Sequence, residues 1–267
     1  MEDFQTRSNG SYSVSRIKDY VKGLPLGHSL LRHVYDKSTL SLVKEVATRI
    51  YNREIDCYVN LEPNSQNIRS ALNVISLIQK ALISSVLELA KDYIENPYIY
   101  QSRINFKKDI KANGWSWHSD FETWNSQDGL ATPECITIML PLDDNRADNG
   151  PLIVLPKSHR DFLSCPKVTG FSVEDHFSDQ KEGVVSNKVV SKLKELVSSE
   201  EEIVLADVGD VFIFNSNLLH RSLPSENGSR TNLFLVISSK GNQPEKSKRK
   251  RPLEMAMTVE EFELEME

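Results

Sequence analysis

The chain has 267 residues, of which 32 are basic and 38 acidic, for a formal net charge of −6. This length suits one β-rich domain as well as two smaller domains, and we predict one. The acidic surplus is spread along the chain, which argues against a nucleic-acid-binding surface, so the expected partner is a small molecule.

Neither a membrane anchor nor a secreted product is expected. No apolar run reaches the roughly 20 residues of a membrane helix, and the first residues, MEDFQTRSNG, lack the charged and apolar regions of a signal peptide. Cys57, Cys135 and Cys165 form no C-x-x-C pair, so reduced thiols are predicted. We therefore expect a cytoplasmic protein with no membrane or nucleic-acid partner, either a monomer or a homodimer.

The first part of the chain is predicted to contain a flexible segment followed by two helices. Residues 1–30 are polar and rich in Ser and Gly, and this segment is expected to be flexible. Apolar residues then recur at helical spacing over 38–52 and again over 70–95. These two segments are predicted to be helices that pack on a sheet.

After Pro97 the pattern changes to short β-branched or aromatic runs separated by Gly, Pro, Asn and Asp, which is typical of strands. The runs are YIYQSRINF at 98–106, ECITIMLPL at 134–142, PLIVLP at 151–156, EEIVLADVGDVFIF at 201–214 and TNLFLVISS at 231–239. They predict an α+β fold, mainly β: a two-sheet jelly roll with the N-terminal helices packed on one sheet. The alternative is an α+β sandwich without a ligand cavity.

A single domain is expected over 31–240. Within it, the mostly polar stretch 157–200 lies between strands and is predicted to act as a lid. The tail 241–267 runs from basic (KSKRKR) to acidic (TVEEFELEME), a pattern typical of solvated chain.

The segment GWSWHSDFETW contains the first candidate metal ligands. His118 and Asp120 are two residues apart, so on a strand both side chains would leave the same face. His220 follows a strand-like run about one hundred residues later, and a jelly roll can pair such distant strands. Two imidazoles and one carboxylate on one side of a metal are the ligand set of non-haem iron(II) oxygenases, which keep the other positions open for co-substrate and O₂. An H-x-D pair alone is a weak signal because it often occurs by chance.

A second signal follows the distal histidine. Arg230 lies ten residues after His220, at the start of an apolar strand that would carry its guanidinium into the barrel. Arginine suits a planar carboxylate such as the far end of 2-oxoglutarate, to which Ser222 could add a hydroxyl. The alternative for Arg230 is a surface residue in a salt bridge.

Four further segments are informative together: QSRINF, WHSDFETW, DNGPLIVLPKSHR, and FNSNLLHRS followed by RTNLFLV. They resemble the phytanoyl-CoA dioxygenase family, particularly its ectoine hydroxylase branch, and the resemblance covers roughly residues 100–240. It implies a double-stranded β-helix fold of the cupin-like type and an enzyme that uses Fe(II), 2-oxoglutarate and O₂ to hydroxylate a C–H bond. It also implies that His118, Asp120 and His220 are the iron ligands and catalytic centre, and that Arg230, Ser222 and Asn105 contact the co-substrate.

The same resemblance implies a substrate pocket. Its residues would be Gln101, Arg103, Trp124, Phe214 and Phe234. Gln101 and Arg103 would share one face of a strand with Asn105, and an inward polar row needs partners. The aromatic residues could instead be ordinary core, although aromatic faces also attract compact cations and zwitterions.

The substrate is predicted from a departure from the branch's pattern. The segment after WHSDFETW carries Asn125, Glu134 and Cys135, which indicates an altered pocket. A small zwitterion such as a proline- or pipecolate-type free amino acid is therefore the predicted substrate. Ectoine is one alternative, and a jelly-roll binding module without catalysis is the other.

Overall fold

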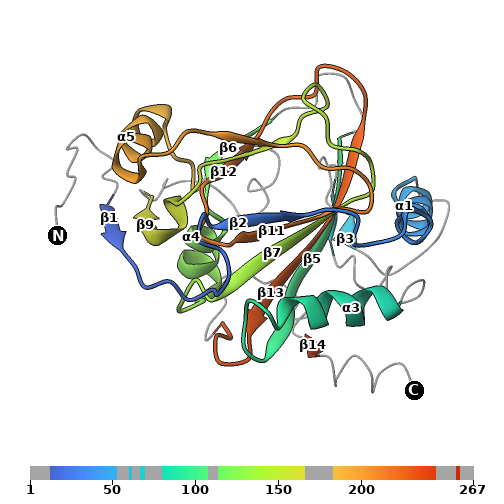
Figure 1. Ribbon diagram of the computed structural model, residues 1–267, viewed down its shortest axis with the longest axis horizontal. Coiled ribbons are helices and arrows are strands. Elements are labelled where there is room, and N and C mark those ends of the chain that lie inside the picture. The colour runs from blue at the N-terminus through green and yellow to red at the C-terminus, as the bar shows by residue number, and fades with distance from the viewer. Residues whose placement is uncertain are drawn as a thin grey trace.

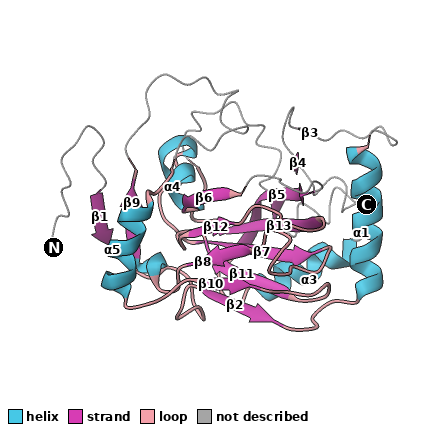
Figure 2. Cartoon of the chain, turned by 90° about the horizontal axis from the view of Figure 1, so that it is seen from above, coloured by secondary structure: helices cyan, strands magenta, loops and turns pink. Residues whose placement is uncertain are grey.

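The sheets of the protein form a jelly roll. A computed structural model describes residues 13–52, 60–61, 67–69, 80–107, 114–165, 183–244 and 257–258. The larger sheet has the strand order β2-β11-β7-β13-β5-β4-β3, and β14 also pairs with β5; the smaller sheet has the order β10-β8-β12-β6 (Figure 1 and Figure 2). Most neighbouring strands are far apart in the sequence and antiparallel, as a jelly roll requires.

The strands of the larger sheet are β2 (His28–Leu31), β3 (Asn60–Leu61), β4 (Asn67–Arg69), β5 (Pro97–Lys107), β7 (Cys135–Pro141), β11 (Val211–Asn215), β13 (Arg230–Ser239) and β14 (Met257–Thr258). Those of the smaller sheet are β6 (Trp115–His118), β8 (Leu152–Val154), β10 (Glu202–Val204) and β12 (His220–Ser222). A separate pair consists of β1 (Ser13–Arg16) and β9 (Asp161–Ser164). The helical elements are α1 (Lys37–Tyr51), α3 (Lys80–Ala90), α4 (Asp120–Thr123), a π-helical turn η1 (Trp124–Asp128), a 3₁₀ turn η2 (Ser158–Arg160) and α5 (Asn187–Val197).

The larger sheet separates two cores. On its outer face, the apolar stripe of α1 and the buried face of α3 pack against Ile104, Ile138 and Leu235. On its inner face, Phe212 and Phe234 meet residues of the smaller sheet. Figure 2 shows α1 and α3 at the opposite end of the molecule from α5. The predicted mainly-β jelly roll with N-terminal helices on one sheet is therefore confirmed.

A β-bulge on β5 determines which residues face the interior. Val236 pairs with Gln101 and Ile237 pairs with Ile99, which leaves Tyr100 as the extra residue. Beyond the bulge, the outer side chains of β5 enter the helix-covered core, and Gln101, Arg103, Asn105 and Lys107 alternate with them. The predicted polar row is thus present, and it is one residue longer than predicted.

The structure differs from the prediction at the N-terminal end of the chain. Residues 13–16 form β1 and 28–31 form β2 at the edge of the larger sheet, where flexible chain was expected. In the proposed lid, 166–182 lies outside the described residues, while α5 packs near Trp117 and Leu219. The tail beyond 244 is described only at β14.

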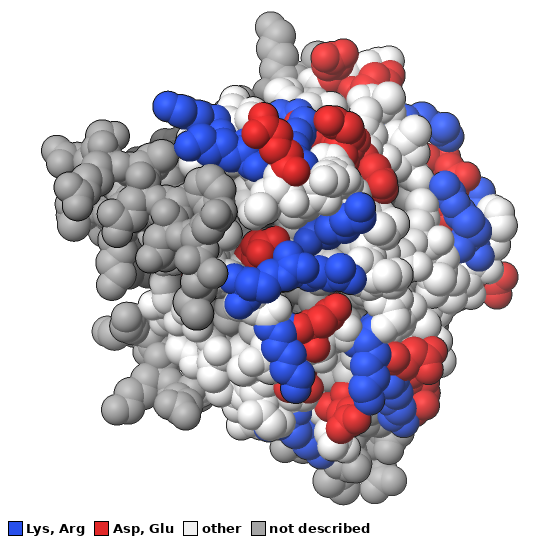
Figure 3. All heavy atoms as spheres, turned by 60° about the vertical axis from the view of Figure 1, so that its left-hand side comes forward, with Lys and Arg blue, Asp and Glu red and all other residues white. Residues whose placement is uncertain are grey.

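Two exclusions made from composition can be compared with the structure. Among the described residues, no helix combines the length and apolar character needed to cross a bilayer. On the face shown in Figure 3, acidic and basic side chains are interspersed, and the described residues there form no continuous basic band.

Candidate active site

Strand pairing brings the two distant histidines together. His118 ends β6, His220 begins β12, and the two are direct partners in the antiparallel register. Their ring centroids are 4.2 Å apart. The smaller sheet therefore converts a separation of about one hundred residues into a side-by-side pair.

Asp120 reaches the site in a different way from the one predicted. It does not continue the strand, because β6 ends at His118 and Asp120 is the first residue of α4. Ser119 caps this short helix, and its Oγ accepts a hydrogen bond from the Glu122 backbone N–H at 3.2 Å. The S-x-x-E pattern at 119–122 is the sequence signal of a helix start that the strand prediction overlooked.

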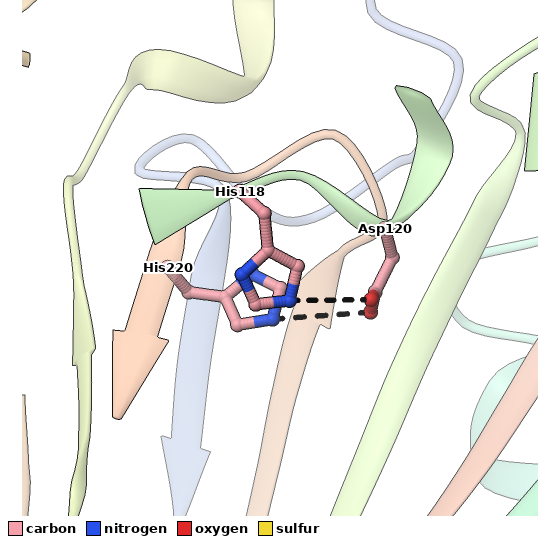
Figure 4. Close-up of side chains that lie close together, drawn as sticks. All are labelled: His118, Asp120 and His220. Atoms are coloured by element: carbon pink, nitrogen blue, oxygen red, sulfur yellow. Dashed lines mark ion pairs between the residues drawn. The ribbon is translucent and has the colours of Figure 1, made fainter. Parts of the chain in front are cut away.

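The three side chains point toward one another (Figure 4). Nε2 of His118 lies 3.8 Å from Oδ1 of Asp120, and Nε2 of His220 lies 4.0 Å from Oδ2. One ligand atom from each residue falls within 4.8 Å of the other two. All are partly or fully buried, so a cation placed among them would be only partly hydrated.

Backbone carbonyls orient both imidazole rings. Nδ1 of His118 lies 2.8 Å from the carbonyl oxygen of Ser116, and Nδ1 of His220 lies 3.0 Å from that of Leu218. With Nδ1–H donating to these oxygens, each Nε2 carries a lone pair facing Asp120. Burial, together with repulsion from His220, lowers the pKa of His118 to about 4, against the opposing effect of Asp120. His118 is therefore neutral at physiological pH, the form that binds a metal.

Arg230 lies on the inner face of the larger sheet and is almost fully buried, at 1% exposure. Its Nε has no hydrogen-bond partner within the described residues. Burial and repulsion from Arg103 lower its pKa to about 10, so it stays charged at neutral pH. A buried guanidinium with an unsatisfied donor fits an anionic ligand such as a carboxylate.

Of the other two residues predicted to contact the co-substrate, one lies on a strand paired with that of Arg230 and one lies on the smaller sheet. Asn105 is on the inner face of β5, opposite Asn232. Ser222 is buried on β12, where its Oγ accepts hydrogen bonds from Trp115 N at 3.2 Å and from Lys107 Nζ at 3.1 Å. Their direct contact with a co-substrate remains a prediction.

The predicted pocket residues are distributed over four different surroundings. Phe214 packs edge-on to His220, with centroids 5.1 Å apart. The Arg103 guanidinium lies over the Phe234 ring at 5.1 Å. Trp124 is buried in a cluster with Tyr100, and Gln101 lies half-buried in the row on β5.

Two polar groups at the site were missed from the sequence. The Tyr100 hydroxyl donates to Oδ2 of Asp128 at 2.6 Å, which ties β5 to the π-helical turn after the ligand-bearing segment. Lys107 continues the polar row on β5 and is buried. The alternation that predicted the row extends to Lys107, so periodicity could have found it; the Tyr100 contact depends on the bulge and could not be read from spacing.

These features define a jelly-roll protein in which two histidines and one aspartate could hold a metal ion and a buried arginine lies on the opposite sheet. The model of the phytanoyl-CoA dioxygenase family matches residues 31–232. The chain belongs to this family, which confirms the predicted resemblance.

Relatives in the same family support the narrower resemblance. The chain is 32% identical over 214 residues to an ectoine dioxygenase of Halomonas elongata, with 75% of this chain and 63% of that protein covered. It is 31% identical over 191 residues to an ectoine dioxygenase of Nocardia farcinica, with 68% and 62% covered. The match thus spans less than two thirds of these relatives. A crystal structure of EctD from S. alaskensis with 2-oxoglutarate and 5-hydroxyectoine is similar in fold, with a TM-score of 0.72, 23% identity, and 96% and 95% of the two chains covered.

Proposed function

We propose that this protein is an iron(II)- and 2-oxoglutarate-dependent dioxygenase that hydroxylates ectoine or a closely related cyclic zwitterion. The main observation behind the proposal is that His118, Asp120 and His220 lie close together while Arg230 is buried in the facing sheet. Nitrogen and carboxylate ligands on one side of a cation suit iron(II) in oxygenases. A cytoplasmic location and a monomeric or homodimeric state remain predictions from the sequence.

The chain's own residues would bind and orient the reactants. When bound, the iron supplies the activation of O₂ that converts 2-oxoglutarate to succinate and CO₂ while one substrate C–H bond becomes C–OH. His118 and His220, held by backbone carbonyls, present Nε2 without rotating. Arg230 would take the far carboxylate of 2-oxoglutarate through paired hydrogen bonds. Phe214 covers one side of His220 and would exclude water there.

The choice of ectoine over a proline-type amino acid corrects the preference drawn from the sequence. That preference rested on changes in 125–135, yet Asn125 Nδ2 donates to the carbonyl of Leu130 at 2.8 Å and Glu134 Oε2 accepts from Ser239 Oγ at 2.8 Å. Both side chains therefore serve local structure. The relatives at 31–32% identity are ectoine dioxygenases, which supports the same substrate class.

A turnover assay tests the proposal. The protein is reconstituted anaerobically with iron(II) and then supplied with O₂, 2-oxoglutarate and ectoine, proline or pipecolate, and succinate and hydroxylated product are measured. We expect succinate and a product 16 mass units heavier with ectoine, and neither with His118→Ala, since one added oxygen atom defines the reaction. Hydroxylated product with proline alone would contradict the proposed substrate class. The absence of both 2-oxoglutarate binding and succinate would support the non-catalytic binding module instead.

A further inference from the structure

A buried lysine ends the polar row on β5, beside the arginine of the co-substrate site. Lys107 is 2% exposed, and Arg230, its direct partner in the β5–β13 register, is 1% exposed. Like charges placed opposite each other destabilise a sheet. A buried ammonium group is also costly unless hydrogen bonds or an anion compensate it.

The hydrogen bonds of Lys107 match its charged form. Nζ donates to Ser222 Oγ at 3.1 Å, to the carbonyl of Gly150 at 3.4 Å and to the carbonyl of Leu223. An ammonium group has three N–H donors and no acceptor, so three acceptors satisfy it completely. These bonds join the end of β5 to two loops and to β12.

The loop at Gly150 leaves space for this side chain. Gly150 has a φ of +76°, and a Cβ there would lie 2.9 Å from Lys107 Nζ and 2.8 Å from the Leu223 carbonyl oxygen. Only glycine fits this backbone without displacing the lysine head. The local backbone is therefore arranged around Lys107.

Ser222 is the side chain through which Lys107 can reach a ligand. A hydroxyl accepts two hydrogen bonds and donates one. Lys107 Nζ and the Trp115 backbone N–H occupy both acceptor positions of Ser222 Oγ. Among the described residues, no acceptor takes the hydroxyl hydrogen, so this donor is available to a ligand.

We propose that Lys107 is a positioning residue for the co-substrate, which fixes Ser222 as a hydrogen-bond donor to the carboxylate that Arg230 binds. This inference rests on the proposed function, since it names a further part of the same site. It differs from a purely structural role for Lys107, in which the lysine would hold the two loops together without any selective effect on the co-substrate.

Binding measurements on metal-loaded protein separate the two roles. The dissociation constants of 2-oxoglutarate and of pyruvate, which lacks the distal carboxylate, are measured by anaerobic calorimetry with cobalt(II) in the site. We expect Lys107→Met and Ser222→Ala each to weaken 2-oxoglutarate binding about tenfold, because Ser222→Ala removes the hydroxyl that would donate to the carboxylate and Lys107→Met removes the hydrogen bond that fixes this hydroxyl. The double variant should be no weaker than Ser222→Ala, and pyruvate affinity should not change in any variant. Lys22→Met, at an exposed ion pair with Glu95, is the matched control.

Each outcome decides one question. An equal loss of pyruvate and 2-oxoglutarate affinity, or additive losses in the double variant, would overturn the positioning role. If Lys107→Met does not fold, Lys107→Gln replaces it, since it retains a polar head without the charge, and the same pyruvate comparison applies. Wild-type protein that binds cobalt but not 2-oxoglutarate would instead remove the proposed function, which distinguishes the two failures.

Discussion

Single residues determine the protonation state and orientation of the groups at this site. The sequence identifies His118, Asp120 and His220 as candidate ligands through the H-x-D pair together with the distal histidine and Arg230, and the structure brings ligand atoms of all three within 4.8 Å of one another. It could not show that carbonyls of Ser116 and Leu218 set the tautomers of both rings, since those contacts depend on the exact backbone path. Residue identity is therefore readable from the sequence, whereas residue orientation required the structure.

Co-substrate affinity is predicted to depend on pH through Lys107. Burial and, second, repulsion from Arg230 lower the pKa of Lys107 to about 7. Below this value the ammonium form holds Ser222 as an acceptor. As pH rises the neutral amine can accept from Ser222 and withdraw its hydroxyl hydrogen. The dissociation constant of 2-oxoglutarate should therefore rise about tenfold between pH 6 and 8.5.

The charged surroundings of Lys107 support this assignment. Arg230 on β13 and, further along β5, Arg103 are both cationic throughout this range. Asp148 in the adjoining loop accepts a hydrogen bond from Asn227 Nδ2 at the surface. The dissociation constant of 2-oxoglutarate is measured by the same calorimetry at several pH values, with Lys107→Met as the control in which it should not change with pH. If the dissociation constant still rises with pH in this variant, another group causes the pH dependence.

Short strands and a short helix position the candidate metal ligands, and the sequence signals for these short elements conflict. Helix α1 follows from periodicity because it buries one apolar face, and the long strands β7 and β13 follow from their β-branched and aromatic runs because they are buried along their whole length. Asp120 was assigned to a strand because H-x-D alternation is compatible with one, although the S-x-x-E pattern starting at Ser119 favoured a helix start. The bulge at Tyr100 had no sequence signal, because it arises from the pairing of β5 with β13.

Removing the cap of α4 should displace Asp120. Ser119→Ala deletes the acceptor for Glu122 N and should cost about 1 kcal/mol of unfolding free energy. It should also weaken cobalt(II) binding, since Asp120 is the first residue of the capped helix. Denaturant unfolding and metal titration measure the two effects. Ser191→Ala, at an exposed position of α5, is the matched control and should leave metal affinity unchanged. An unchanged affinity in Ser119→Ala would contradict this role of the cap.

The hydrogen bond between Tyr100 and Asp128 should stabilise the position of Trp124, a predicted wall of the substrate pocket. Tyr100→Phe removes the hydroxyl that donates to the buried Asp128 carboxylate and should cost about 1–3 kcal/mol of unfolding free energy. Because Tyr100 also packs edge-on to Trp124, with centroids 5.3 Å apart, we expect KM for the substrate to rise more than KM for 2-oxoglutarate. Steady-state kinetics with both compounds measures the two KM values. Equal increases in both would show that Tyr100 has no selective effect on the substrate.

At the scale of the whole molecule, the proposed ligand site would have its two ends on different sheets. His118 and His220 belong to the smaller sheet, and Asp120 follows it directly, whereas Arg230 belongs to the larger sheet. A molecule that binds the metal at one end and Arg230 at the other therefore connects the two sheets. The jelly roll was predictable from its strands, but this division of the site between the sheets depends on register.

Binding of metal and co-substrate should consequently stabilise the fold in two separable steps. Cobalt(II) at about one hundred times its dissociation constant should add about 2.7 kcal/mol, and saturating 2-oxoglutarate should add a second increment of similar size. For a domain of this size each step corresponds to a Tm increase of roughly 5–10 °C in a thermal melt. Arg230→Met should keep the metal step and lose the 2-oxoglutarate step, while Arg146→Met, at an exposed ion pair with Asp144, should keep both. A chelator should reverse both steps together, because the co-substrate binds through the metal. If the second step survives in Arg230→Met, the far carboxylate is held by another group and the two sheets are not connected in this way.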